Sequence, residues 1–126
     1  MNWPDAEAVL VAWLASALGV RVCTDTPADL AEVLPLLRVR RIGGTDDGFR
    51  IDHALVDVDA FGPSRVDASA LAARTRAALL DLLPGSTAAG AVVTAAGTVS
   101  APARRPWENP NVHRFGATYT LHLHTA

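Results

Sequence analysis

Apolar residues near the start of the chain recur at the spacing of one helix face. The positions are Ala6, Val9, Leu10, Trp13, Leu14, Ala17 and Leu18. Because residues three and four apart lie on the same side of an α-helix, this pattern predicts a helix from about Pro4 to Leu18. Pro4 suits a first helical turn, where its missing N–H is not needed, and Gly19 stands where helices commonly end.

Alternation of apolar and polar residues dominates the next part of the chain. A short strand is predicted at residues 20–24, followed by a turn or short helix after Thr26. Residues 36–42 and 51–61 then alternate on either side of a segment rich in Gly and Asp, residues 43–48. Two such runs around a turn predict a long antiparallel hairpin with one face on a core. The inward set is Ala54, Val56, Val58 and Ala60, and the outward set is His53, Leu55, Asp57 and Asp59.

A second helix is predicted at about residues 64–83, before Pro84 and Gly85. Its expected inward stripe, widened by Leu79 and Leu83, is Val66, Ala70, Ala73, Ala77 and Leu80. Alanine in such a stripe permits close approach to a sheet but buries less apolar area than leucine.

The C-terminal third predicts two more strands joined by a long loop. Residues 90–100 form the weaker strand candidate, and residues 101–113 hold three prolines and little periodicity. The last strand alternates clearly, with Phe115, Ala117, Tyr119, Leu121 and Leu123 on one face. The whole pattern predicts a single α+β domain, residues 1–126, with a small mixed or antiparallel sheet of about four to five strands and two main helices packed on one face.

Composition narrows the possible functions. Half of the 126 residues are apolar, which excludes a disordered tail, and the net charge of −2 gives no reason to expect nucleic acid or a membrane as a general partner. The apolar run at residues 8–18 is too short to span a bilayer and follows acids instead of cations. We therefore expect no membrane association and a chain that is unprocessed and cytosolic when made.

Motifs for catalysis or cofactor binding are weak. The single Cys23 lies in a predicted strand and is expected to be a structural thiol, and no phosphate-binding glycine loop is present. His122 and His124 share a strand face, so a metal site is an alternative if His113 or the pair Asp57 and Asp59 came near. We expect no catalytic residues, no cofactor and no metal.

Charged residues offer a different kind of site. Arg38 and Arg40, with Arg50 across the hairpin, can oppose Asp57 and Asp59 as cross-strand pairs. This predicts either a solvated charged sheet face or a subunit contact. A second basic cluster, Arg104 and Arg105, has one aromatic neighbour, which is too few for a nucleic-acid stacking platform.

The order of these segments resembles a known family. Leu-Gly-Val-Arg-Val (18–22) is followed by Thr-Asp-Thr-Pro-Ala-Asp-Leu (24–30), by Leu-Arg-Val-Arg-Arg-Ile-Gly-Gly (37–44), and by Asp-His-Ala-Leu-Val-Asp-Val-Asp (52–59) before an Ala-rich helix. The chain closes with Arg-Pro-Trp (105–107), Asn-Pro-Asn-Val-His-Arg-Phe (109–115) and Ala-Thr-Tyr-Thr-Leu-His-Leu (117–123). This order is similar to that of the tail terminator and tail completion proteins of siphophages.

The resemblance implies an assembly role and no catalytic residues. It implies a small antiparallel sheet with helices on one face, and a ring, typically a hexamer, on the end of the tail tube. That ring stops tube polymerisation, offers a surface to the head–tail connector or stopper, and lets phage DNA pass through its lumen without sequence-specific binding. It places the chain in the tail–neck region of the virion.

Two groups of residues are the interface candidates, because ring subunits need complementary patches and because Trp and Arg are often energetic at interfaces. They are Arg38, Arg40, Asp57 and Asp59 on the hairpin, and Arg104, Arg105, Trp107 and Asn109 on the loop. Alternatives stay open: Trp107 folds back onto its own core, the chain is another neck protein such as a connector or stopper, or it is a small metal-binding enzyme.

Overall fold

The computed structural model describes residues 2–126 and contains one six-stranded sheet in the order β1-β2-β3-β6-β5-β4. The helices are α1 (Ala6–Leu18) and α2 (Arg65–Asp81), with a 3-10 turn η1 (Leu30–Glu32). The strands are β1 (Arg21–Cys23), β2 (Leu36–Asp46), β3 (Asp52–Gly62), β4 (Thr87–Ala88), β5 (Ala91–Arg105) and β6 (His113–Thr125). The predicted α+β class is confirmed, and the strand beyond the predicted number is β4, whose two residues are too few for a periodic pattern.

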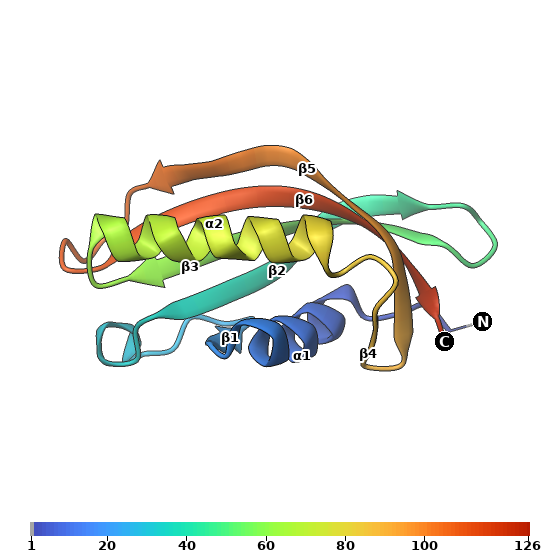
Figure 1. Cartoon of the computed structure of the whole chain (residues 1–126), viewed down its shortest axis with the longest axis horizontal. Coiled ribbons are helices and arrows are strands. Elements are labelled where there is room, and N and C mark those ends of the chain that lie inside the picture. The colour runs from blue at the N-terminus through green and yellow to red at the C-terminus, as the bar shows by residue number, and fades with distance from the viewer. Residues whose placement is uncertain (1) are drawn as a thin grey trace.

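Both helices cover the same face of the sheet (Figure 1). β2, β3, β6 and β5 pair antiparallel, whereas β1 pairs parallel to β2. The core lies between helices and sheet, and β6 contributes the expected alternate residues to it. These are Phe115, Ala117, Tyr119, Leu121 and Leu123, all 9% exposed or less.

Helix α1 follows its predicted pattern, with a later start. Asp5 is the N-cap, and its carboxylate accepts a hydrogen bond from the Ala8 N–H at 3.1 Å. Pro4 therefore precedes the cap and does not occupy the first turn. Gly19 ends the helix at φ 64°, a left-handed conformation that costs glycine little.

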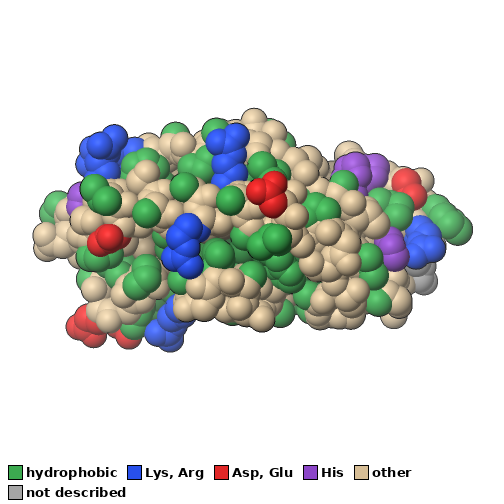
Figure 2. Space-filling view, in the orientation of Figure 1, with side chains coloured by type: hydrophobic (Ala, Val, Ile, Leu, Met, Phe, Trp, Pro, Cys, Tyr) green, Lys and Arg blue, Asp and Glu red, His purple; other side chains and the backbone are tan. Residues whose placement is uncertain are grey.

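Helix α2 buries a different stripe from the predicted one. Its inward residues are Ala68, Leu71, Ala72, Thr75, Ala78 and Leu79, whereas Val66 is 76% exposed and Ala70, Ala73 and Ala77 face solvent. Alanine on several sides leaves the helix without a strong apolar direction, so Leu71 and Leu79, which bury more area, set the inward side. Apolar patches consequently remain visible around α2 between scattered charged groups (Figure 2).

The β2–β3 hairpin is longer than predicted and its turn lies later. β2 continues through Gly43 and Gly44 to Asp46, with a register shift between Arg41 and Gly43. Gly44 has φ 120°, and a Cβ there would collide with the carbonyl oxygen of His53. The turn itself is built on Asp47, whose carboxylate accepts hydrogen bonds from the N–H groups of residues 49, 50 and 51. The hairpin tip projects beyond the helices (Figure 1).

The predicted loop at residues 101–113 is about half strand. β5 continues to Arg105 through register shifts at Val93/Ala95, Thr98/Ser100 and Ser100/Ala103, so only residues 106–112 form the connection to β6. These irregularities let Pro102 occupy an edge strand, and they also hide the alternation that would have predicted it. Among residues 2–126, no helix combines the length and apolarity required to cross a membrane.

Candidate subunit interface

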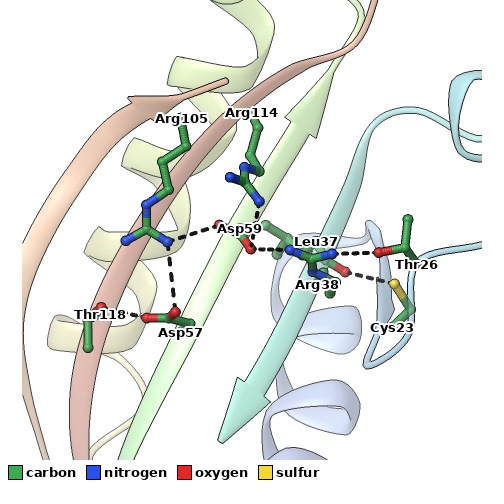
Figure 3. A network of polar contacts seen from close by, with 9 residues as sticks. All are labelled: Cys23, Thr26, Leu37, Arg38, Asp57, Asp59, Arg105, Arg114 and Thr118. Carbon is green, nitrogen blue, oxygen red and sulfur yellow. Dashed lines mark hydrogen bonds and ion pairs between the residues drawn. The ribbon is translucent and has the colours of Figure 1, made fainter. Parts of the chain in front are cut away.

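The sheet face away from the helices carries a charged cluster near the end where β3 meets α2. Alternate residues of β2, β3 and β6 point to this face, and Arg105 reaches it from the edge strand β5 (Figure 3). We call this set the charged cluster: Arg38, Asp57, Asp59, Arg105, Arg114 and Thr118.

Arg38 and Asp59 form the buried centre of the charged cluster. A guanidinium nitrogen of Arg38 lies 2.7 Å from a carboxylate oxygen of Asp59, and the residues are 7% and 1% exposed. Arg38 also donates to the hydroxyl of Thr26, which ties the loop before β2 to the sheet. Arg38 pairs with Asp59 and Arg40 with Asp57 across the hairpin, so the two arginines oppose the two acids as expected. The expectation of a solvated face was wrong for Arg38 and Asp59, because two loops cover them; Arg40 remains exposed.

Asp59 is shared by three arginines. Besides Arg38, Arg105 lies 3.4 Å and Arg114 4.0 Å from its oxygens, and Arg105 also lies 3.8 Å from Asp57. Asp57 accepts a hydrogen bond from the Thr118 hydroxyl. Burial lowers the pKa of Arg114; Asp59 raises it, while Arg38 and Arg105 lower it further. Three guanidinium groups therefore face two carboxylates, which leaves an excess of positive charge.

Trp107 packs within its own chain. Its ring meets Phe61 edge-on at a centroid distance of 5.0 Å, and the guanidinium groups of Arg38 and Arg114 lie 5.5 and 5.1 Å from its centroid. It adds to a second apolar cluster of Leu30, Leu36, Phe61 and Val112. The alternative that Trp107 folds back onto its own core is thus what the structure shows, although the ring stays only half-buried. A contact from its outer edge to another chain remains a prediction.

Two hollows flank Trp107. A groove of about 590 Å³ lies between residues 26–32 and residues 107–112. A smaller pocket of about 250 Å³, called here the arginine pocket, is lined by Arg104, Arg105, Pro106, Trp107, Pro110, Val112, His113 and Arg114. Asn109 shapes the loop beside both, since its side-chain oxygen accepts the N–H of Asn111 at 2.9 Å.

The histidines do not converge. His53 and His122 stack at 4.2 Å at the hairpin end, and Arg50 contacts His124 instead of the predicted acids. His113 lies nine residues before His122 along β6, which corresponds to about 30 Å of extended strand. Within residues 2–126, no three His, Cys, Asp or Glu side chains are placed to hold a metal ion. These histidines therefore do not come together within residues 2–126 as the metal-site alternative required.

Cys23 fits a structural thiol. It is half-buried, its sulfur lies 3.6 Å from the carbonyl oxygen of Leu37, and burial raises its pKa. A thiol with a raised pKa holds less of the nucleophilic thiolate at neutral pH.

Sequence reasoning missed Arg114, Thr118 and Thr26 as members or partners of this site. Arg114 and Thr118 alternate with the apolar residues of the last strand, but the sequence does not show which strands lie beside that strand. It also missed a second pair, in which Arg41 holds both oxygens of the buried Asp52 at 2.6 and 2.8 Å. Only the antiparallel pairing of β3 with β6 and the register shift after Arg41 bring these groups together.

The fold of this chain also occurs in a solved structure. A chain in the virion of a native gene transfer agent particle superposes with a TM-score of 0.61, covering 88% of this chain and 84% of that chain at 15% identity. That likeness establishes a shared fold. None of the curated proteins matches the sequence.

A match to a protein-family model identifies the family of this chain. The model of the phage tail termination protein family matches residues 2–101 of the 126. The chain therefore belongs to the phage tail termination proteins and is a structural protein of a phage tail. The matched residues end within β5, so Arg104, Trp107 and all of β6 lie beyond them.

Proposed function

We propose that the chain forms a ring, most simply a hexamer, that caps the tail tube, stops its polymerisation and joins the tail to the head connector. The match to the tail termination family over residues 2–101 carries this proposal. In the particle the ring occupies the tail–neck region, with the tail tube protein on one side and a connector or stopper protein on the other. Phage DNA passes through the lumen without sequence-specific contacts.

The two edges of the sheet meet the requirement for ring closure. Head-to-tail contacts close a ring only when a subunit carries two different, complementary patches. One edge is formed by β1 and the uncovered part of β2, and the other by β4 and the uncovered part of β5. The two edges differ in sequence, and only the β5 edge carries repeated register shifts, so they can supply two different patches.

Both edges are protected against simple strand addition. The N–H of Arg41 on β2 donates to the carboxylate of Glu7 at 2.9 Å, and β5 carries three register shifts and Pro102. Such features prevent unlimited edge-to-edge pairing. Subunit contacts are therefore expected to use side chains, and the exposed Arg40 and Arg104 with the outer parts of Arg105, Trp107 and Asn109 are the nearest candidates.

Tail assembly without this chain tests the proposal. Particles made without it are expected to contain overlong tails that lack heads, and the added purified protein is expected to restore tail length. Tails of normal length with unstable head joining would instead indicate a connector or stopper. Particles that assemble normally without the chain would contradict the proposed function.

A further inference from the structure

Segments of opposite charge lie beside the two edges of the sheet at one end of the molecule: the loop after β1 holds acids, although Arg21 on β1 itself is exposed, and the end of β5 holds arginines. Arg21 pairs with Leu36, Leu36 with Phe61, Phe61 with Arg114, and Arg114 with Arg105. This row crosses from β1 to β5, a width of about 19 Å at the usual strand spacing. The segment before Leu36 and the end of β5 are thus at one end of the molecule and on opposite sides of it (Figure 1).

The β1 edge ends in an acidic loop, residues 24–35. It contains Asp25, Asp29 and Glu32, and no Lys, Arg or His. All three acids are exposed, and none makes an ion pair within residues 2–126. Although Asp29 precedes η1, its side chain makes no capping hydrogen bond to that turn.

The β5 edge ends at the arginine pocket. Arg104, Arg105 and Arg114 line it, and no acid does. Arg104 is exposed, and the side chains of Arg105 and Arg114 are 31% and 20% exposed. The Nε of Arg114 is buried with no hydrogen-bond acceptor among the described residues. An incoming carboxylate would compensate the positive charge that Asp57 and Asp59 leave unbalanced.

We propose that the acidic loop of one copy docks its carboxylates into the arginine pocket of the next copy around the ring. The inference rests on the proposed ring and names its subunit contact. In a ring whose axis is parallel to the strands, a given residue lies at the same height along the axis in every copy. The acidic loop of each copy then lies at the height of its neighbour's arginine pocket. The charge of the site favours this partner over DNA. With Arg104, four guanidinium groups face the two carboxylates of Asp57 and Asp59, an excess that two acids of the loop balance and that a phosphate backbone would exceed.

Charge reversal with rescue by mixing tests the contact. One variant carries Asp29→Arg and Glu32→Arg, the other Arg104→Glu and Arg105→Glu, and each is added to purified tail tubes. Each variant alone is expected to cap tubes at least about tenfold more weakly than the wild type, because like charges meet at every contact. An equal mixture is expected to cap normally, since loop and pocket then attract in an alternating ring.

Controls separate the contact from the fold and from the proposed function. Arg76→Glu and Asp81→Arg, made separately, each reverse one charge on the exposed side of α2, as Arg104→Glu alone does at the pocket, and are expected to cap like the wild type. If the second variant fails to fold because Arg105 contacts Asp57 and Asp59, Arg104→Glu alone replaces it.

Each remaining outcome decides between partners. If the wild type and both charge-reversal variants cap tubes equally well, the proposed contact is wrong and the proposed function is unaffected. Wild type that fails to cap would overturn the function itself. If only the arginine reversal weakens capping, and the same reversal abolishes binding of a labelled DNA duplex, the pocket serves DNA phosphate and the proposal is wrong.

Discussion

The two faces of the sheet use the same strands in different ways. On the helix side, alternate residues of β3 and β6 are aliphatic or aromatic and are almost fully buried. On the other side, most of the residues between them are Asp, Arg, Thr and His, with Leu55 and Phe61 as the large apolar exceptions, and two loops cover them at one end. The helix side is stabilised by buried apolar area, and this contribution does not depend on which apolar side chains touch one another. The loop side is stabilised by particular ion pairs, so it depends on which side chains meet.

This difference has a consequence for assembly. Apolar packing is satisfied within the subunit, but the charged cluster holds more guanidinium groups than carboxylates. A face that is folded but electrostatically incomplete is suited to receive a partner.

The largest effect is expected from breaking the buried pair on the loop side. Asp59→Asn leaves the guanidinium of Arg38 buried without its counter-ion, so the free energy of unfolding should fall by about 3–5 kcal/mol. Chemical denaturation measures it. Replacing both partners, by Arg38→Met with Asp59→Leu, should cost much less. Equal losses in Asp59→Asn and in Asp57→Asn, whose native side chain is 17% exposed, would show that burial does not decide the effect.

A smaller effect is expected on the helix side, and it distinguishes the two sides of α2. Leu79→Ala removes a fully buried side chain and should lower the free energy of unfolding by about 3 kcal/mol. Val66→Ala, at a position 76% exposed, should change it by less than about 0.5 kcal/mol. Thermal unfolding of the two variants provides the comparison. If Val66→Ala lowered the free energy of unfolding more than Leu79→Ala, the inward side of α2 would be the one predicted from the sequence.

Trp107 tests whether the loop over the charged face belongs to the fold. Trp107→Ala should cost about 2 kcal/mol, roughly half the value for a fully buried ring, because the ring is half-buried against Phe61. The matched control is Trp3→Ala, at a position 43% exposed, with little expected change. Denaturation by urea followed by circular dichroism avoids the altered fluorescence. If Trp107→Ala is as stable as the control but caps tails poorly, the ring acts only at an interface.

The smallest effect is a pH dependence on the helix side. Burial raises the pKa of Tyr119 to about 12, above its ordinary value of 10.0. The unfolded chain releases this proton first, so stability is full below pH 10 and falls above it, by at most about 1.4 kcal/mol per pH unit. At pH 11 the expected loss is about 1 kcal/mol relative to Tyr119→Phe. Parallel pH profiles for the two proteins would contradict the burial of this hydroxyl group.

The helix side could be predicted from the sequence more fully than the loop side. Alternation in β3 and β6 gave the buried residues correctly, because a two-residue period needs no knowledge of the partner strand. The stripe of α2 could not be predicted, since alanine on several sides leaves the packing of Leu71 and Leu79 to decide it. The end of β5 was concealed by its bulges, which interrupt the period.

The charged cluster was half predictable for a related reason. Arg38 lies opposite Asp59 because of the register of the β2–β3 hairpin, and the turn of a hairpin specifies its register. The contributions of Arg105 and Arg114 depend on β6 lying between β3 and β5, a non-local arrangement. Burial of the pair depends further on Thr26 and Trp107, which reach it from two loops. No periodic pattern encodes contacts of this kind.

Cryo-electron microscopy of intact particles would show where the chain lies and so would test the proposed ring. We expect one ring of this chain between the last ring of the tail tube and the head connector, with the acidic loop of each copy on the arginine pocket of the next. Absence of the chain from that junction, in particles whose tails end normally, would contradict it.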